Sequence, residues 1–321
     1  MKKIVMVDQS FDDLSICRNI IESAGMEFAV FNDTSEEGIL KNAADADGVI
    51  TSYGKFTKRV IDGLPKCKVI SRTGVGVDNV DVAEATARGI AVCNVPGYAT
   101  DVVSDHAITL ALSVLRRINE LDANLRKGIW GYSALRPLGE VYGLTFGVVG
   151  MGHIGRAVAE KARGLGFHVI CCSHSLVPGN HTPEGFEIYS YEDVLRQADV
   201  VSFHVELLPD TRHMLNAQNI GLLKQDAIVV NTARGAVIDT RALAEALTAG
   251  KLFGAGIDVF EEEPIAPDDP LLQAPHTVLT PHCAFWSEKA GAELERRSAQ
   301  APVDVLQGKI PRDCLNPQVL G

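Results

Sequence analysis

The sequence predicts an α/β protein with two doubly wound parallel sheets, each covered by helices on both faces. Three observations support this prediction. Short apolar runs alternate with helical patterns along most of the chain, as in proteins whose parallel strands are joined by crossover helices. The 321 residues are enough for two domains. A glycine pattern, Gly150-Met-Gly152-His-Ile-Gly155, directly follows an apolar run near the middle of the chain.

The first hundred residues contain five predicted strands separated by helical segments. Strands are expected at 4–7, 28–31, 48–51, 69–70 and 91–92, and helices at 14–21, 36–44 and 60–64. Parallel sheets bind ligands at the carboxyl ends of their strands, and two loops that leave those ends are basic. One carries Lys55, and the other carries Arg72 before Thr-Gly-Val-Gly76. Either an anion site or a solvated lysine and an ordinary glycine turn would explain these loops.

The alternation stops near Pro96-Gly97, and Thr100-Asp101 begins a long helical pattern. Its apolar positions recur every three or four residues from Val103 to Leu121. We therefore predict a hinge followed by a buried connecting helix. A linker over 127–143 then leads to the glycine pattern.

The stretch from 145 to 173 predicts a dinucleotide site. Residues 146–149 form an apolar run that is expected to be a buried strand. Gly150 permits the turn that follows, Gly152 lets backbone amides approach a pyrophosphate, and Gly155 lets the next helix pack against the strand. The helix N-terminus then faces the anion. An ordinary glycine-rich turn is the alternative, but the apolar stripe of a helix and a second apolar strand follow, as a dinucleotide-binding fold requires.

Further strands are expected at 169–172, 200–205, 227–230, 255–259 and 278–279, and helices at 191–197 and 240–247. They predict a second doubly wound sheet. Residues 288–306 form a final amphipathic helix, which we expect to return to the first domain. Pro302 is expected to kink it.

Composition limits the partners. Thirty basic against 41 acidic residues give a net charge of −11, and no basic cluster interrupts this balance, so nucleic acid and anionic membranes are poor partners. No apolar run approaches a membrane span, and Asp8 follows only four apolar residues, which indicates a first strand and not a signal peptide. We expect a cytoplasmic protein. The seven cysteines lack C-x-x-C spacing and are expected to be reduced, mostly buried and without a metal site.

Three later stretches, together with the glycine pattern, resemble one family. They are Val230-Asn-Thr-Ala-Arg-Gly-Ala-Val-Ile-Asp239, Gly256-Ile-Asp-Val-Phe-Glu-Glu-Glu-Pro264 and Leu279-Thr-Pro-His282. In this order the four motifs resemble the D-isomer-specific 2-hydroxyacid dehydrogenases over essentially the whole chain. The resemblance implies a Rossmann nucleotide-binding domain over 99–286, inserted into a flavodoxin-like substrate domain formed by 1–98 and 287–321. It also implies hydride transfer between NAD or NADP and a 2-keto acid or D-2-hydroxy acid.

The resemblance implies a role for each matching residue. Arg234 matches the arginine that binds the substrate carboxylate and carbonyl oxygen, Glu263 the acid that partners the catalytic histidine, and His282 the proton donor. Asp258 matches the acid that binds the nicotinamide carboxamide. The other expected cofactor-binding residues are Gly150, Gly152, His153, Ile154, Gly155, Ser173, His174, His204, Val205, Thr211, Thr232 and Ala233. The other expected substrate-binding residues are Lys55, Arg72, Val75, Gly76, Phe285 and Trp286. Glu206 stands where the family usually has proline, which concerns only local loop shape.

The three catalytic candidates also suit the chemistry by themselves. Hydride addition to a ketone carbon leaves an alkoxide that needs a proton, and a histidine titrates near working pH. A carboxylate on its other nitrogen fixes the tautomer and favours the imidazolium. Arginine binds a carboxylate through a bidentate fork. Taken singly, Arg234 could instead pair with Asp239, Glu263 could be an exposed glutamate, and His282 could be an ordinary loop residue.

The segment Pro281-His-Cys-Ala-Phe-Trp-Ser-Glu288 is similar to the branch that includes the C-terminal-binding-protein co-repressors and related bacterial dehydrogenases. Phe285 and Trp286 would then either wall the substrate pocket or pack at the hinge. We expect an enzyme, since all three catalytic positions are filled, and the alternative is a dinucleotide-sensing binding protein like the co-repressors. Phosphoglycerate dehydrogenase, hydroxypyruvate or glyoxylate reductase, and a reductase of branched keto acids remain open.

Cofactor choice follows from a departure from the family. NAD-selective members carry an acidic residue at the end of the second strand of the nucleotide domain, whereas this chain has Ser173-His174-Ser175. No carboxylate there repels a 2′-phosphate and no arginine attracts one, so we expect use of both cofactors with a slight lean to NADP.

The helix from Thr100 and the linker around Trp130 lie where the family forms its dimer contact. Leaving Ile129, Trp130 and Tyr132 in water would be costly, so we expect a twofold homodimer.

Overall fold

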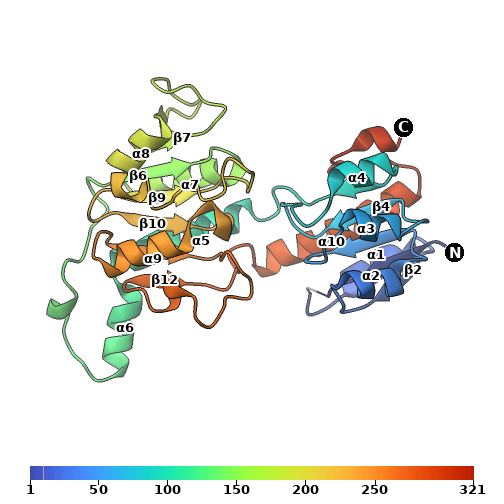
Figure 1. The fold of residues 1–321 in the computed structure, drawn as a ribbon, viewed down its shortest axis with the longest axis horizontal. Helices are drawn as coiled ribbons and strands as arrows, with labels where there is room; N and C mark the ends of the chain where they lie inside the picture. Colours follow the sequence, from blue (N-terminus) through green and yellow to red (C-terminus); the bar gives the residue numbers. More distant parts are fainter. Residues whose placement is uncertain (10) are drawn as a thin grey trace. The chain divides into compact units, whose positions relative to one another are not determined.

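The computed structural model describes residues 1–9 and 11–321, and the chain divides into two compact units. The first unit comprises Met1–Ala99 and Ser287–Gly321, and the second comprises Thr100–Trp286. The second unit is therefore inserted between two segments of the first. In Figure 1 the blue and red ends of the chain belong to the first unit, and the green to orange segments belong to the second.

The first unit contains a five-stranded sheet with the order β2-β1-β3-β4-β5, and all neighbouring strands are parallel. This is the order of flavodoxin-like folds. The strands are β1 (Lys3–Met6), β2 (Glu27–Val30), β3 (Gly48–Thr51), β4 (Val69–Arg72) and β5 (Ala91–Cys93). The helices are α1 (Ser15–Ser23), α2 (Glu36–Ala43), α3 (Lys58–Asp62), α4 (Val82–Ala87), α10 (Glu288–Leu306) and the 3₁₀ helix η5 (Pro317–Val319).

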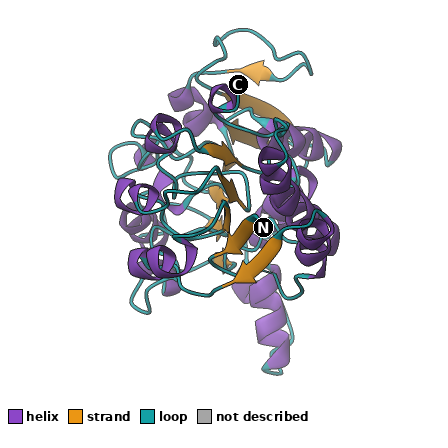
Figure 2. Cartoon of the chain, turned by 90° about the vertical axis from the view of Figure 1, so that its right-hand side faces the viewer, coloured by secondary structure: helices purple, strands orange, loops and turns teal. Residues whose placement is uncertain are grey.

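Alternate residues of each central strand enter opposite cores of the first unit. In β1, Ile4 and Met6 belong to the core formed with α1 and α10, whereas Val5 belongs to the core formed with α2, α3 and α4. Strands and helices are distinguished by colour in Figure 2. Because both faces of the sheet are buried, its strands are continuous apolar runs that the sequence reveals directly.

Helix α10 runs continuously through Pro302. Proline has no N–H, so the carbonyl of Ser298, one turn earlier, loses its helical donor. The hydroxyl of Ser71, on β4, donates to that carbonyl at 2.9 Å. The sheet thus supplies the hydrogen bond that the proline removes.

The second unit contains a seven-stranded parallel sheet with the order β12-β11-β10-β9-β6-β7-β8. The strand order reverses between β9 and β6, as in Rossmann folds. The strands are β6 (Thr145–Val149), β7 (His168–Cys172), β8 (Glu187–Ile188), β9 (Val200–Phe203), β10 (Ile228–Asn231), β11 (Gly254–Ile257) and β12 (Thr277–Leu279). The two sheets confirm the predicted fold class.

The second unit contains both α-helices and 3₁₀ helices. The α-helices are α5 (Thr100–Leu115), α6 (Ile118–Arg126), α7 (His153–Gly164), α8 (Tyr191–Gln197) and α9 (Thr240–Thr248). The 3₁₀ helices are η1 (Ser133–Leu135), η2 (Ile220–Leu222), η3 (Gly235–Val237) and η4 (Pro270–Leu272).

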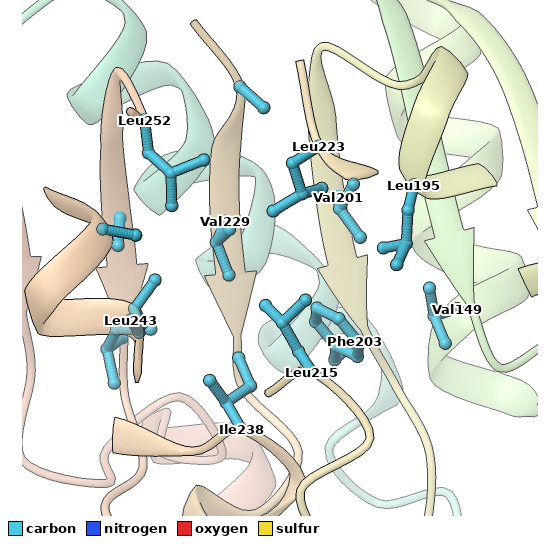
Figure 3. Packing of buried hydrophobic residues seen from close by; sticks show 14 of the residues in the cluster. Val149, Leu195, Val201, Phe203, Leu215, Leu223, Val229, Ile238, Leu243 and Leu252 are labelled. Atoms are coloured by element: carbon cyan, nitrogen blue, oxygen red, sulfur yellow. The ribbon is translucent and has the colours of Figure 1, made fainter. Parts of the chain in front are cut away.

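Two cores enclose the second sheet. Val201 and Val229 of the strands share one core with Leu195 of α8 and Leu243 of α9 (Figure 3). The opposite core is formed with α5 and α7 and contains strand residues such as Val148. The helices therefore hold the carboxyl ends of the strands in fixed positions.

Three elements differ from the sequence prediction. Helix α4 (Val82–Ala87) was not predicted. The pattern over 100–121 predicts one helix, but α5 ends at Leu115 and α6 begins at Ile118. Arg117 between them has a left-handed φ of 52°, and its guanidinium donates to the carbonyl of Leu135 at 2.9 Å. This distant contact interrupts the helix. Strand β8 was not predicted, because two residues are too few to show a period.

No helix in the described part of the chain has the length and apolar character needed to cross a membrane. All seven cysteines have free thiols, and five of them are buried, namely Cys17, Cys67, Cys93, Cys171 and Cys172. Burial raises the pKa of Cys67 and of Cys172 to about 12. These thiols therefore stay protonated near neutral pH.

Candidate active site

The glycine pattern forms the turn between β6 and α7. Gly150 has a φ of 97°, and a Cβ there would lie 2.5 Å from the carbonyl oxygen of His204. A Cβ on Gly155 would lie 1.9 Å from the carbonyl oxygen of Gly150. In contrast, the Cβ position of Gly152 faces open space, with no heavy atom of the described chain within 4 Å. Gly152 is also the N-cap of α7 and leaves the first amides of the helix without a side-chain cap. This arrangement fits a pyrophosphate.

The end of β7 lies beside this turn, because the N–H of Gly150 donates to the carbonyl of Cys172 at 2.9 Å. Ser173 follows and is half-buried, while His174 and Ser175 are exposed. The two serine hydroxyls lie 3.5 Å apart. Hydroxyl groups and an imidazole therefore occupy the position where NAD-selective relatives have a carboxylate.

His204 follows β9, and its backbone contacts the glycine turn. Its Nε2 atom lies 2.8 Å from the hydroxyl of Ser202, which is buried. Burial lowers the pKa of His204 to about 3, so the ring is neutral near neutral pH. Farther along the loop, the hydroxyl of Thr211 donates to the carbonyl of Glu206 at 2.6 Å. That bond closes the loop at the position where the family usually has proline.

Arg234 lies in the short segment between β10 and η3. The side chain of Asn231 holds this segment, since Nδ2 donates to the carbonyl of Arg234 at 2.9 Å and Oδ1 accepts from the N–H of Ala233 at 3.0 Å. A Cβ on Gly235 would lie 1.9 Å from the carbonyl carbon of Phe260. The Arg234 segment therefore packs directly on the turn that precedes Glu263.

Thr232 lies at the start of the same segment, at the carboxyl end of β10. Its hydroxyl oxygen is buried and makes no hydrogen bond within the part of the chain that the structure describes. A buried polar atom normally has a partner. This hydroxyl is therefore available to a polar group of a bound cofactor.

Glu263 and His282 form a hydrogen-bonded pair. Oε2 of Glu263 lies 2.6 Å from Nδ1 of His282, and Oε1 accepts from the N–H of Phe260 at 3.0 Å. An ionised carboxylate only accepts, so Nδ1 carries a proton and Nε2 is the nitrogen that can transfer one. The two side chains are 33% and 31% exposed, respectively, which leaves them accessible to a ligand.

Opposing effects set the charge of Glu263. Burial alone would raise its pKa, but hydrogen bonds from His282 and from the N–H of Phe260, with the positive charges of His282 and Arg234, outweigh this effect and lower the pKa. Glu263 is therefore ionised near neutral pH.

Asp258 follows β11 and is completely buried. Its Oδ1 accepts from the hydroxyl of Thr280 at 2.6 Å and from the N–H of Cys283 at 3.0 Å, and its Oδ2 accepts from the N–H of Ala284 at 3.0 Å. Its own carbonyl accepts from the N–H of His282 at 2.7 Å. Asp258 thus holds both the start and the continuation of the His282 loop.

Two aromatic side chains continue this loop. The ring of Phe285 meets His282 edge to face at a centroid distance of 6.0 Å, and Trp286 meets Phe285 in the same way at 6.2 Å. Phe285 therefore supports one side of the imidazole.

In the first unit, Arg72 is the last residue of β4, and the other predicted residues lie in the loops that follow β3 and β4. The buried carboxylate of Asp8 shapes the loop before Lys55, because it accepts from the backbone N–H groups of Ser52, Tyr53 and Gly54 at 2.6, 2.7 and 2.8 Å. The amide of Asn94 donates to the carbonyl of Val75 at 2.6 Å and holds the next loop. Asp8 and Asn94 therefore support the loops that carry Lys55, Val75 and Gly76.

Comparison with known proteins agrees with this geometry. Residues 108–284 match the model of the D-isomer specific 2-hydroxyacid dehydrogenase, NAD binding domain. A glyoxylate reductase of Korarchaeum cryptofilum is 38% identical over 290 residues, which cover 89% of this chain and 87% of the relative. The chain belongs to the D-isomer specific 2-hydroxyacid dehydrogenase family.

Other proteins are similar to this dehydrogenase in sequence or in fold. A D-3-phosphoglycerate dehydrogenase of Methanocaldococcus jannaschii is 36% identical over 318 residues, which cover 98% of this chain and 60% of the relative. The solved TT0316 protein from Thermus thermophilus has a TM-score of 0.90 and 34% identity, and an acyclic imino acid reductase (Bsp5), solved with NADPH and D-Arg, has a TM-score of 0.89 and 27% identity. Each structural match covers 98% of this chain and 99% of the other.

The family confirms the predicted enzyme class. This dehydrogenase is an NAD(P)-dependent oxidoreductase that transfers hydride between a 2-hydroxy acid and the corresponding 2-keto acid. Within the second unit, the structure brings Arg234, Glu263 and His282 close together, although 48 residues separate the first from the last. The glycine turn, His204 and Ser173 lie at the carboxyl ends of β6, β9 and β7 in the same sheet.

Several residues that support the predicted positions were not themselves predicted. In the first unit they are Asp8 and Asn94, and in the second unit they are His106, Ser202 and Asn231. Only His106 could have been noticed in the sequence, because it is a polar residue beside the apolar stripe of α5, next to Ala107. Such a residue on a helix that covers a sheet needs a hydrogen-bond partner, which only the fold identifies.

Proposed function

We propose that this dehydrogenase reduces a short 2-keto acid, such as glyoxylate or hydroxypyruvate, and that His282 is the proton donor. The hydrogen bond of 2.6 Å between Nδ1 of His282 and Oε2 of Glu263 is the main support for this mechanism. The size of the substrate is supported by the relatives named glyoxylate reductase. A phosphorylated three-carbon acid is the second candidate, favoured by the relative named D-3-phosphoglycerate dehydrogenase.

Each catalytic residue has one task. Arg234 binds the carboxylate and the carbonyl oxygen of the keto acid through its planar fork of N–H groups. Glu263 stabilises the imidazolium of His282 before the reaction. A bound reduced nicotinamide supplies hydride to the keto carbon. His282 then gives the proton on Nε2 to the developing alkoxide, which becomes the hydroxyl group of the 2-hydroxy acid. The proton on Nδ1 stays on the ring, hydrogen-bonded to Glu263.

The cofactor residues follow the carboxyl edge of the second sheet. Gly150, Gly152, His153, Ile154 and Gly155 bind the pyrophosphate at the N-terminus of α7. Ser173 and His174 contact the adenosine ribose, and His204, Val205 and Thr211 line the adjoining loop. Thr232, Ala233 and Asp258 bind the nicotinamide end. Oδ2 of Asp258, which accepts one backbone N–H in the fold, is the acceptor that we assign to the carboxamide.

Cofactor preference follows from the end of β7. With Ser173 and His174 there, the dehydrogenase uses both dinucleotides and slightly favours NADP. Parallel measurements of kcat/KM with NADH and NADPH test this proposal. A preference for NADH above about a hundredfold, about 2.7 kcal/mol, would refute it. A Ser173→Asp variant is the matched comparison, because a carboxylate at this position should shift the ratio toward NADH.

The substrate side of the proposal comes from the sequence. Lys55, Arg72 and the backbone amides of Val75 and Gly76 bind the anionic end of the keto acid, and Phe285 and Trp286 contact its tail. Replacing Arg72 by alanine should then raise KM more than it lowers kcat. An unchanged KM for every active keto acid would remove Arg72 from the proposal.

The decisive experiment is a cofactor-oxidation screen over 2-keto acids with the parent protein and the His282→Ala variant. Glyoxylate, hydroxypyruvate, 3-phosphohydroxypyruvate and a branched keto acid separate the substrate classes. We expect the variant to lose about 10²- to 10⁴-fold in kcat on the best substrate and to bind dinucleotide normally. A variant that keeps more than about a tenth of kcat, with chemistry rate-limiting, would refute the acid assignment.

A further inference from the structure

Helix α5 lies unusually close to strand β11. A Cβ on Gly256 of β11 would lie 2.7 Å from Cβ of Leu110, and one on Gly254 would lie 2.6 Å from Cγ1 of Val114. Because the strand has no side chains at these two positions, the helix backbone can approach it. His106 precedes Leu110 by one helical turn and so reaches the carboxyl end of the sheet, where Asp258 and Thr280 follow β11 and β12.

Three side chains form a hydrogen-bonded chain at this edge. Nε2 of His106 lies 2.9 Å from the hydroxyl oxygen of Thr280, and that hydroxyl lies 2.6 Å from Oδ1 of Asp258. Nε2 of His106 is itself 3.6 Å from Oδ1, too far for a direct hydrogen bond. Thr280 therefore connects the histidine to the buried carboxylate.

The single proton of the Thr280 hydroxyl determines which groups donate and which accept in this series of hydrogen bonds. A carboxylate oxygen accepts, so the single hydroxyl proton of Thr280 points to Asp258. The same hydroxyl must then accept from His106, and Nε2 of His106 must carry a proton. The ring of His106 is thereby fixed as the first donor of a relay that ends at Asp258.

Asp258, where the relay ends, in turn holds the backbone around the proposed proton donor. The carboxylate of Asp258 accepts from the N–H groups of Cys283 and Ala284, and its carbonyl accepts from the N–H of His282. His282 has a left-handed φ of 51°, which a residue with a side chain rarely adopts without support. The orientation of its imidazole toward substrate depends on these bonds.

We propose that His106 is a positioning residue for catalysis, which acts through Thr280 to orient the Asp258 carboxylate and the loop that carries His282. The proposal rests on the proposed role of His282 as the acid. The hydrogen bond of His106 goes to Thr280, so its effect on the reaction is exerted through the direction in which the Asp258 oxygens point. A rotation of the carboxylate would move the His282 loop, and a displacement of about 1 Å at a reacting group can cost about a hundredfold in rate.

Two pairs of variants separate positioning from packing. His106→Leu removes the N–H donor, whereas His106→Gln keeps an N–H at the end of a side chain of similar reach. Thr280→Val removes the hydroxyl and keeps the shape, whereas Thr280→Ser keeps the hydroxyl. We expect His106→Leu and Thr280→Val to lower kcat for keto-acid reduction by about 10- to 100-fold, with a smaller effect on KM. His106→Gln and Thr280→Ser should recover most of the activity.

A double variant and a spectroscopic measurement complete the test. Because the two residues act in one chain, His106→Leu with Thr280→Val should be little worse than Thr280→Val alone. Nitrogen-15 NMR of histidine-labelled protein without cofactor should show His106 protonated at Nε2, and Thr280→Val should abolish this tautomer preference. Equal activity of His106→Leu and His106→Gln, or the opposite tautomer in the parent, would overturn the proposal.

The His282→Ala and His106→Leu variants distinguish a failure of the His106 relay from a failure of the proposed proton donor. If His282→Ala loses activity but His106→Leu does not, only the relay is wrong. If His282→Ala remains active, the proton donor itself is wrong, and the NMR result alone then decides whether the relay exists.

Discussion

Nδ1 of His282 and the N–H of Phe260 bind the two oxygens of the same Glu263 carboxylate, at 2.6 and 3.0 Å. The carboxylate is therefore fixed at both ends, and its lowered pKa keeps it charged beside the imidazole. This geometry places a fixed negative charge against the imidazole of His282.

Replacing Glu263 by glutamine tests what this charge contributes to the reaction. The variant keeps the size and a hydrogen-bonding group but removes the negative charge, so the imidazolium is less stabilised. Keto-acid reduction should then lose activity at lower pH than in the parent as the pH rises. A pH profile of kcat/KM with an alkaline limb at the parental position would show that the carboxylate charge has no such effect.

Gly152 and Gly155 should respond differently to alanine. A Cβ at Gly155 would overlap the carbonyl of Gly150, so we expect Gly155→Ala to lower the free energy of unfolding by about 1–3 kcal/mol. A Cβ at Gly152 meets only open space in the protein, so Gly152→Ala should keep stability but weaken dinucleotide binding by about tenfold or more. Thermal unfolding and titration with dinucleotide distinguish the two variants. Similar effects of both variants on both measurements would contradict the assigned pyrophosphate position.

The pKa of His204 predicts an effect of acid on stability. Its folded-state pKa of about 3 lies below the value of about 6.5 in an unfolded chain, so the unfolded state binds the extra proton. The stability present above pH 6.5 should be lost as the pH falls toward 3, with a slope of up to about 1.4 kcal/mol per pH unit. Because part of the residue remains accessible, this slope is an upper limit.

Urea unfolding at several pH values tests the role of His204. Its replacement by glutamine should reduce the slope between pH 6 and 4. An identical slope in parent and variant would show that another group causes the loss of stability.

Aromatic side chains in the second unit predict self-association. Trp130 is 90% exposed, and Ile129, Tyr132 and Tyr142 are each more than half exposed. So many large apolar side chains exposed within residues 129–142 would be costly to leave in water, so we expect a dimer with twice the chain mass of 34.5 kDa. Light scattering should give this mass for the parent and for Val177→Asp, a control at an exposed apolar residue elsewhere, and a smaller mass for Trp130→Asp. A parental mass near 34.5 kDa at micromolar concentration would reject the dimer.

The predictable parts of the fold have local causes. Strands buried on both faces appear as apolar runs, so the sequence reveals them directly. The glycines of the turn after β6 are needed by the turn itself and by the helix that follows, so their pattern is also evident from the sequence. Glu263 and His282 are 19 residues apart, and no spacing rule joins them. Their pairing was predicted only through resemblance to a family.

The remaining features depend on contacts between distant parts of the chain. His106 and Thr280 are 174 residues apart, and their hydrogen bond exists because α5 crosses a strand with glycines at the contact. The break between α5 and α6 similarly depends on Arg117 reaching Leu135. Periodicity along one helix contains no information about such partners.

The backbone contact at Gly235 limits how this active site can diverge. Because Gly235 lies directly against Phe260, the arginine segment and the glutamate turn move as one body. A mutation that shifts one of them would displace the other, so neither can be tuned alone to a new substrate. We therefore expect selection for altered substrate range, in nature or in the laboratory, to leave this paired segment untouched and to accumulate changes in the surrounding loops.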